Sequence, residues 1–367
     1  MPESNCFWRY KGYGKSCSLK VLTAAGLSAR QAQLDYRPIL RSSYSNKRGN
    51  WKWKSTMILC VNLNAAIDRT VIVENYTLDA IHRSRKTLAL PGGKGCNCAR
   101  VFKTLGAQPV VTGWAAGYGG KFIESGLRAE GISTSLVHTS GESRTCYSII
   151  DPVRRTLTEV YEASQPVTGF DRVRFERVYK KLISVCELVT LSGSLPGGLP
   201  DDYYACLIQI AHKKGVPVFL DTSGEPLRLG LEQGIPTLMK PNLSELSALN
   251  RKMPQSESEI LAAMMQVYLT YKTMIVVSQG KAGALAISGG HIWKAVPPEV
   301  AAISAVGSGD ALLAGIAYGF SRGSPFEEAM RLGVAAGTAN TLQIGAGRVD
   351  LADILRLQNE VIVSQIG

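Results

Sequence analysis

The segment AVGSGDALLAGIAYG, residues 305–319, combines an anion-binding corner with a carboxylate. Small residues that open a helix leave several backbone N–H groups without intrahelical partners, and the helix dipole makes that end positive. Such a corner suits a phosphate. A fixed negative charge beside a phosphate is unfavourable unless it has a task of its own, and the task that suits Asp310 is to take a proton from an attacking hydroxyl. The alternative for Asp310 is a plain helix cap.

The common nucleotide motifs do not match. PGGKGCN, residues 91–97, lacks the Ser/Thr that follows the lysine of a P-loop, and neither glycine-rich stretch has the G-x-G-x-x-G spacing of a dinucleotide site. What remains is a set of four separated glycine-bearing corners, each of which follows or opens an element: PGGKGCN, LSGSLPGGLP (191–200), VSQGKAG (277–283) and VGSGD (306–310).

These corners carry a family resemblance. GGKGCNCARVFKTLGA resembles the first signature of the ribokinase-like (PfkB) carbohydrate kinases, and AVGSGDALLAGIAYG resembles their second signature, near the C-terminus as expected. Between them, LSGSLPGGLPDDYY, LDTSGEPL and KPNLSEL resemble the hexose-phosphate branch, which contains 1-phosphofructokinases and tagatose-6-phosphate kinases. The resemblance runs from about Met57 to the end. It implies an ATP- and Mg²⁺-dependent kinase that converts a ketohexose monophosphate, fructose 1-phosphate or tagatose 6-phosphate, to the bisphosphate.

The resemblance also assigns roles to residues. Asp310 matches the catalytic base, and the N–H groups of Gly307, Ser308 and Gly309 would stabilise charge on the transferred phosphoryl group. The positions that match the acceptor site are Asp68, Gly92, Gly93, Lys94, Asn97 and Arg144. Arg144 matches the arginine placed on the substrate's own phosphate, a task that suits a planar, bidentate cation. For Lys94 and Arg144 the alternative is a solvated surface charge, and for Asp68 it is a structural cap.

On the nucleotide side, Asn242 and Glu245 match an N-x-x-E motif that holds Mg²⁺ through water. Lys240 would lie close behind the phosphates. Ser278, Gly280 and Gly283 resemble the nucleotide-binding loop, with the adenine beside the helices that carry Ala336 and Asn340.

Three departures lie near the acceptor. Ser308 stands where alanine is frequent in 1-phosphofructokinases and brings the motif closer to tagatose-6-phosphate kinases. Cys146 stands where asparagine is common, and EASQPV, residues 162–167, replaces an acidic-Pro-Gly-Pro run. The sequence therefore leaves the identity of the sugar open.

The elements that position these residues follow an α/β pattern. From Met57 onward, short β-branched runs such as MILCVNL and VPVFLDTS alternate with longer helical patterns. Gly106, Gly131 and Gly215 stand where helices would need a left-handed C-terminal residue. This alternation predicts a mostly parallel sheet with helices on both faces, and the resemblance implies a ribokinase-like three-layer αβα sandwich with a small β-sheet lid.

Two segments break the alternation. Residues 70–90 and 144–164 alternate apolar and polar side chains, the second around a turn at Asp151-Pro152. We expect antiparallel strands from about 68–90 and 144–164 to form the lid over the carboxyl ends of the main strands. Helices are expected near 325–342 and 350–366.

Charge divides the chain of 367 residues into two parts. Residues 1–56 contain eleven Lys/Arg against Glu3 and Asp35, so this segment carries +9 of the net charge of +12. The remaining +3 is ordinary for an enzyme, and we expect no nucleic-acid partner. We expect residues 1–56 to be a basic extension that is disordered, either upstream sequence with Met57 as the true start or an organelle-targeting leader, and residues 57–367 to be the kinase domain.

The remaining composition points to a cytoplasmic protein. The eight cysteines contain no C-x-x-C pair, which favours buried thiols in a reducing compartment over zinc or disulfides. No apolar run is long enough to span a membrane. The expected partners are ATP and the sugar phosphate, with a homodimer through the lid. Two rival functions are kept: a kinase of an unphosphorylated sugar or nucleoside on the same fold, and a catalytically silent sugar-phosphate sensor.

Overall fold

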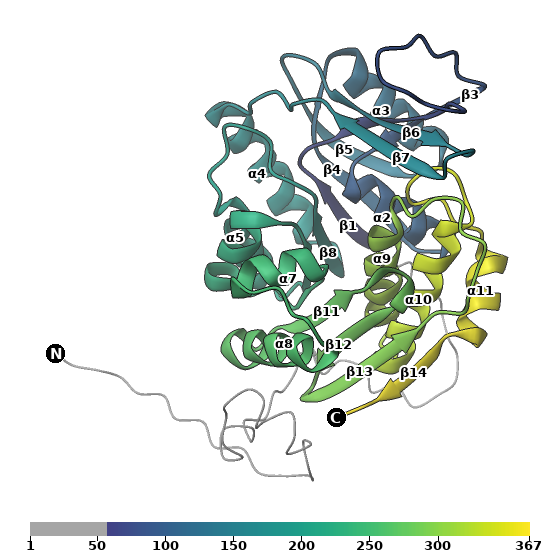
Figure 1. Ribbon diagram of the computed structural model, residues 1–367. Helices are drawn as coiled ribbons and strands as arrows, with labels where there is room; N and C mark the ends of the chain where they lie inside the picture. The colour runs from purple at the N-terminus through teal and green to yellow at the C-terminus, as the bar shows by residue number, and fades with distance from the viewer. Residues whose placement is uncertain (1–56) are drawn as a thin grey trace.

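A ten-stranded sheet forms the centre of the protein. The computed structural model describes residues 57–367 (Figure 1); the predictions made for residues 1–56 lie outside this range. In spatial order the strands are β14 (Ile362–Gln365), β13 (His291–Val296), β12 (Ala284–Ser288), β11 (Met274–Ser278), β10 (Leu238–Met239), β9 (Val218–Asp221), β8 (Leu188–Ser192), β1 (Met57–Asn62), β4 (Gln108–Ala116) and β5 (Ser133–Thr139).

The sheet is parallel from β11 to β5 and antiparallel from β11 to β14. Strand β1 lies inside the parallel part, and its residues Ile58 to Val61 are fully buried because helices cover both faces. The antiparallel end was not anticipated. Gly289 and Gly290, both with positive φ, make the tight turn from β12 to β13.

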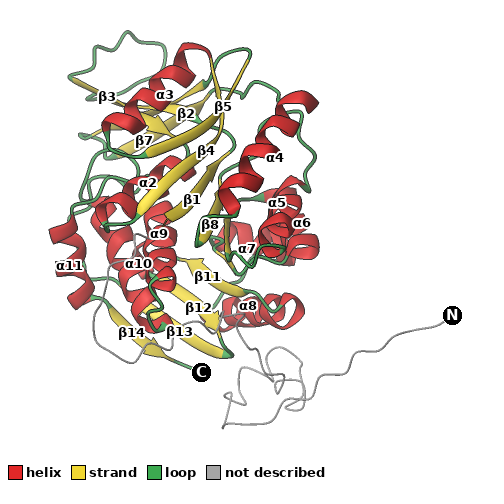
Figure 2. Ribbon diagram, turned by 180° about the vertical axis from the view of Figure 1, so that it is seen from behind, coloured by secondary structure: helices red, strands yellow, loops and turns green. Residues whose placement is uncertain are grey.

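Helices cover the sheet in two layers (Figure 2). One layer packs on the core around Phe102 and Leu313, and the other packs on the core around Phe175 and Leu220. The first layer contains α2 (Lys94–Thr104), α3 (Gly117–Ala129), α9 (Ser308–Ser321), α10 (Phe326–Thr341) and α11 (Leu351–Glu360). The second contains α4 (Gly169–Ile183), α5 (Tyr203–His212), α6 (Gly224–Leu229), α7 (Leu243–Asn250) and α8 (Glu257–Tyr271).

Helix ends agree with the sequence in three places and differ in one. Gly106, Gly131 and Gly215 have φ of 89°, 71° and 67°, as their predicted positions after a helix require. The helix expected over 350–366 is wrong beyond Glu360: β14 follows and pairs with β13. The β-branched run Val361 to Val363 fits a pleated edge strand better than a helix.

A second, smaller sheet stands beyond the carboxyl end of β1, in the order β3 (Lys86–Gly92), β2 (Ala66–Ile72), β6 (Arg144–Asp151) and β7 (Thr156–Tyr161). Its outer pairs are antiparallel, but β2 and β6 are parallel, which corrects the expectation of an all-antiparallel lid. The long connection through β4 and β5 allows the chain to return in the same direction.

The two faces of the small sheet differ. Asp68, Cys146 and Tyr161 are cross-strand partners and therefore share a face, the one on which the Asp68 carboxylate meets the backbone N–H of Gly93. The opposite face is apolar, with Val71, Ile149, Tyr147 and Val160 around a shallow cavity.

These layers confirm the predicted fold class, a three-layer αβα sandwich with a mostly parallel central sheet and a small second sheet. Within residues 57–367, no helix combines the length and the apolar character needed to cross a membrane.

Candidate active site

The N-terminus of α9 is built around two glycines. Gly307 precedes the helix with φ of 84°, and a Cβ there would collide with Ala346 and Gly347. Further along α9, Gly315 allows the backbone of α10 to approach at Gly333, so the helix is held closely against its neighbour. Asp310 is the third residue of α9 and only 6% exposed. The glycine-bearing helix end and the carboxylate thus occur together, and the binding of an anion there stays a prediction.

Asp310 has a raised pKa. Burial is the main cause and the Asp221 charge adds to it, whereas Lys94, Lys240 and the Asn97 hydrogen bond oppose it, leaving the Asp310 pKa at about 6. Asn97 Nδ2 donates to Asp310 Oδ2 over 2.8 Å. A carboxylate with a pKa near 6 is a better proton acceptor at neutral pH than an ordinary aspartate, and it is still ionised there.

Two lysines flank this carboxylate and share one counter-ion. Asp221, at the end of β9 and 1% exposed, lies 2.9 Å from Lys94 Nζ and 3.3 Å from Lys240 Nζ. Burial disfavours the Asp221 charge, but the two lysines lower its pKa overall. Although burial works against it, the pKa of Lys94 is raised by Asp221 and Asp310. Lys240 Nζ also lies beside Gly309, 3.4 Å from where a Cβ would stand.

The glycines before α2 allow a close approach of two polar side chains. A Cβ on Gly92 would collide with the Asp68 carboxylate, and one on Gly93 would collide with the Asn62 amide. Gly93 N–H donates to Asp68 Oδ2 over 3.4 Å, and Asn62 Nδ2 donates to the Gly92 carbonyl over 3.0 Å. Burial raises the pKa of Asp68, against the effect of this N–H and of nearby arginines. Asp68 is thus held beside the loop that carries Lys94.

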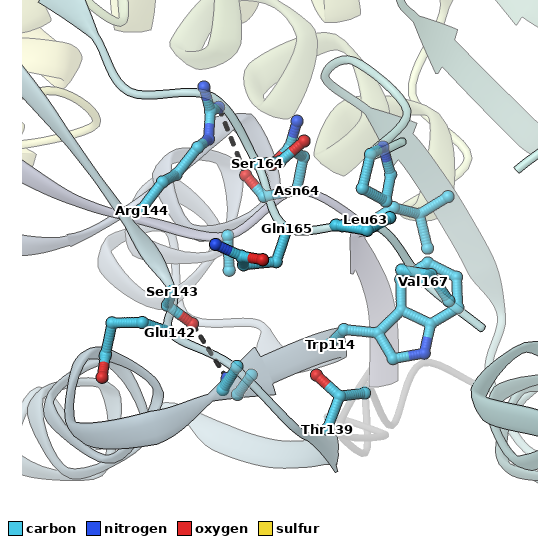
Figure 3. Close-up of a pocket in the computed structure, with 15 residues that line it drawn as sticks. Leu63, Asn64, Trp114, Thr139, Glu142, Ser143, Arg144, Ser164, Gln165 and Val167 are labelled. Carbon is cyan, nitrogen blue, oxygen red and sulfur yellow. Dashed lines mark hydrogen bonds between the residues drawn. The ribbon is translucent and has the colours of Figure 1, made fainter. Parts of the chain in front are cut away.

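Arg144 lines a polar pocket at the start of β6 (Figure 3). Its guanidinium reaches only backbone carbonyls, those of Asn64 at 3.4 Å and Glu162 at 3.5 Å, and its buried Nε has no hydrogen-bond partner. Gln165 and Ser164 line the same pocket. A guanidinium with weak carbonyl contacts and a buried unpaired N–H is able to receive an anion.

Asn242 and Glu245 begin α7 as a capping box. Glu245 N–H donates to Asn242 Oδ1 over 2.9 Å, and Asn242 N–H donates to Glu245 Oε2 over 2.8 Å. The other oxygen of Glu245 remains available. Among residues 57–367, no group of three or more His, Cys, Asp or Glu side chains is arranged to hold a metal ion. The amide and carboxylate oxygens of this pair are donors of the kind that a largely hydrated Mg²⁺ takes.

The loop from Ser278 to Gly283 lies directly beside this capping box. Ser278 forms a β-bridge with Asn242, and Gln279 N–H donates to the Gly283 carbonyl over 2.8 Å. Gly280 and Gly283 have φ of 58° and 90°, and a Cβ on Gly283 would collide with the Ala295 carbonyl. The structure thus brings together the residues that the sequence placed on the nucleotide side.

The position of an adenine beside α10, the helix that carries Ala336 and Asn340, stays a prediction. Both residues are fully buried. Asn340 fixes two loops: its Nδ2 donates to the Val306 carbonyl and to Ser308 Oγ, at 2.8 and 3.2 Å, and its Oδ1 accepts from Gly347 N–H at 2.8 Å. A buried amide with all its groups bonded is a structural support of the anion-binding corner.

Sequence reasoning missed Asn62, Asp221 and this role of Asn340. Asn62 and Asp221 each end a continuous apolar run, MILCVN and VFLD, and a polar residue at the carboxyl end of a parallel strand is a signal that could have found them. Asn340 carries no such signal, because two of its three partners are 32 and 34 residues away.

Comparison with known proteins agrees with this chemistry. Residues 56–352 match the family model described as pfkB family carbohydrate kinase. The tagatose-6-phosphate kinase of Staphylococcus epidermidis is 32% identical over 310 residues, which cover 83% of this chain and 99% of the relative.

Solved structures give the same result. A protein named as a possible 1-phosphofructokinase from Thermotoga maritima superposes with a TM-score of 0.79 at 28% identity, covering 85% of this chain and all of that one. Phosphofructokinase-2 from Escherichia coli in complex with fructose-6-phosphate gives 0.78 at 26% identity, covering 84% and 99%. This chain therefore belongs to the pfkB family of carbohydrate kinases and is a phosphotransferase.

Proposed function

We propose that this protein transfers the γ-phosphoryl group of ATP to a hydroxyl of a ketohexose monophosphate and releases the bisphosphate and ADP. The observation that carries the proposal is Asp310, a buried carboxylate with a raised pKa at the N-terminus of α9, flanked by Lys94 and Lys240. Fructose 1-phosphate and tagatose 6-phosphate are the candidate acceptors, and the relative from Staphylococcus epidermidis favours the second.

In the proposed reaction, the sugar hydroxyl oxygen attacks the γ-phosphorus and its proton passes to Asp310. The bond from phosphorus to the bridging oxygen of ADP breaks, and ADP leaves with that electron pair. Negative charge on the phosphoryl oxygens meets the N–H groups of Gly307 and Gly309 and the charge of Lys240. The Ser308 N–H, which the resemblance also assigned to this task, donates to the Ala305 carbonyl over 3.1 Å. Asn97 orients the base through its 2.8 Å hydrogen bond.

The phosphate already on the acceptor is assigned to Arg144. Its Nε is buried without a hydrogen-bond partner and its other contacts are weak carbonyl contacts, so an anion in the pocket would improve its bonding. A neutral sugar would offer this N–H a hydroxyl oxygen, which is a weaker acceptor for a guanidinium than a phosphate oxygen. This observation favours a sugar phosphate over the rival acceptor, an unphosphorylated sugar or nucleoside. Asp68 is assigned to the sugar hydroxyls.

ATP and Mg²⁺ are assigned to the other side of the cluster. Lys240, Ser278, Gly280 and Gly283 would contact the nucleotide, and Asn242 with Glu245 would hold Mg²⁺ through water. When bound, the metal neutralises charge on the triphosphate. The support for this assignment is the contact between the capping box and the Ser278 loop.

We also propose a homodimer through the apolar face of the small sheet. Val160 is 54% exposed there, and Leu78 and Ile81 on the β2–β3 connection are 85% and 90% exposed. Replacing Val160 and Val71 with glutamate should then yield a monomer by sedimentation velocity, and an unchanged mass would contradict the proposal.

The six cysteines of residues 57–367 are all unpaired, which supports the cytoplasm as the site of action.

A panel of acceptors in a coupled ADP assay tests the function. Tagatose 6-phosphate or fructose 1-phosphate should give the highest kcat/KM, and Asp310→Asn should lower that rate by a factor of about 10² to 10⁴. Equal rates with unphosphorylated ketohexoses or nucleosides would favour the rival kinase. ADP formation with none of the acceptors, combined with tight binding of a sugar phosphate, would indicate the silent sensor.

A further inference from the structure

Asp221 is the most deeply buried charged group of the site, and none of the roles assigned above belongs to it. It ends β9, opposite Ser192 in the sheet register, and lies beneath the two lysines. A buried carboxylate is unfavourable unless it is paired, so its place between two ammonium groups calls for an explanation. Neither lysine has another ion-pair partner among residues 57–367.

The two lysines come from different parts of the fold. Lys94 opens α2, directly after the glycine loop that touches Asp68, and its side chain is 38% exposed. Lys240 follows β10, is 4% exposed, and faces the N-terminus of α9 at Gly309. Among residues 57–367, Asp221 is therefore the carboxylate that is ion-paired to both lysines, one after the glycine loop and one beside Gly309, and its charge also acts on Asp310.

We propose that Asp221 is a positioning residue for phosphoryl transfer: it holds Lys94 and Lys240 on opposite sides of the reacting phosphoryl group and keeps the four-group cluster with Asp310 electrically neutral. Its carboxylate does not touch the substrate. Asp221 Oδ1 accepts a hydrogen bond from Lys94, whereas Oδ2 lies at ion-pair distance from Lys240 without a hydrogen bond. Each ammonium group has three N–H donors, so both keep donors for a ligand. This proposal rests on the proposed function, since it assumes that Asp310 is the base.

The charges around Asp310 determine what the test should show. The groups that face Asp310 are Lys94, Asn97 and Cys98 from α2, Asp221 from β9, and Lys240 after β10. Asp221→Asn removes a negative charge from the cluster and leaves both lysine charges. The acid limb of kcat/KM should then move to lower pH by about one unit. Lys94→Met removes a positive charge, so the limb should move to higher pH.

The experiment compares full pH profiles of kcat/KM for the wild type, Asp221→Asn and Lys94→Met. Asp221→Asn should also lower kcat at pH 8 at least about tenfold, because the lysines lose their fixed orientation, with an unchanged Mg²⁺ requirement. Asp171→Asn is the matched control: Asp171 is a buried carboxylate in the capping box of α4, far from the cluster in sequence, and its loss should leave the limb in place. An unmoved limb in Asp221→Asn, or shifts of the same sign in both test variants, would overturn the proposal.

A second variant covers the case in which Asp221→Asn fails to fold. The double substitution Asp221→Asn, Lys240→Met removes both partners of the buried pair, so Lys240 is not left buried without its counter-ion. Its limb should return to the wild-type position while kcat stays low; a normal kcat would overturn the proposal. Failure of the proposed function appears separately, as near-normal turnover by Asp310→Asn. A raised Mg²⁺ requirement with an unmoved limb would identify Asp221 as a metal-linked residue instead.

Discussion

Replacing Asp310 with asparagine should make the protein more stable and, at the same time, slower by a factor of about 10² to 10⁴. The Asp310 pKa of about 6 stands about two units above its ordinary value of 3.8. Each unit corresponds to about 1.4 kcal/mol, so the ionised side chain costs about 3 kcal/mol of folding free energy. Asparagine has the same shape and can still accept from Asn97, but it carries no charge to bury. The free-energy cost of burying the Asp310 charge would thus appear as an increase in the free energy of unfolding of the variant.

The sign depends on pH. A carboxyl group whose pKa is raised in the folded state binds protons more tightly there, so stability falls as pH rises from about 4 to about 6. The cost is fully present above pH 6 and absent below about 4. Equilibrium urea unfolding at pH 8 should show Asp310→Asn more stable than the wild type by about 3 kcal/mol, and the difference should shrink steadily toward pH 4.5.

Asp151 provides a control of opposite sign. Although burial works the other way, the backbone N–H groups of Arg154 and Tyr76 lower the pKa of Asp151 overall. Asp151→Asn should therefore destabilise the protein at pH 8, with a smaller effect in acid.

The raised Asp310 pKa should also appear in the activity, as an acid limb of kcat/KM near pH 6. A less stable Asp310→Asn at pH 8, or a limb below pH 5, would refute the account of the base.

Three further substitutions test the surroundings. Arg144→Ala should raise KM for the sugar phosphate and leave KM for ATP unchanged, so that kcat/KM falls about tenfold to a hundredfold. Arg144→Lys should recover part of this loss. An equal loss with a neutral hexose would contradict the assignment. Asn340→Leu breaks the three bonds that hold the α9 corner and should cost about 2 to 4 kcal/mol in thermal unfolding; a neutral effect would show that the corner does not need this support. Gly283→Ala should raise KM for ATP, because the added Cβ collides with the Ala295 carbonyl and distorts the loop. Steady-state kinetics at saturating sugar phosphate measure this KM. An unchanged KM for ATP would show that the loop does not bind the nucleotide.

Local signals in the sequence account for most of the fold. Continuous apolar runs such as MILCVN become strands buried on both faces, and helix C-terminal glycines stand where the chain turns, because both are set by neighbouring residues. The predictions for the pairing of β2 with β6 and for the segment that forms β14 were wrong, because strand direction and edge pairing depend on segments far away in the chain. Periodicity does not contain that information.

The candidate site divides in the same way. Asp310, Lys94 and Asn97 belong to short motifs whose residue types indicate phosphoryl-transfer chemistry, and the structure brings these residues together. The buried residues that hold them, Asp221 and Asn340, are determined by packing between separate elements, so no motif identifies them. The capping box of Asn242 and Glu245 shows the limit from the other side, because the same letters serve a helix end and suit a hydrated metal.

The most direct test of the central claim is the fate of the γ-phosphoryl group, followed by ³¹P NMR during turnover of ATP with tagatose 6-phosphate or fructose 1-phosphate. The account predicts a new phosphomonoester signal on the sugar, formed in step with ADP, and a rate of formation lower by a factor of about 10² to 10⁴ with Asp310→Asn. Inorganic phosphate in place of the sugar ester, or transfer to an unphosphorylated ketohexose at the same rate, would contradict the account.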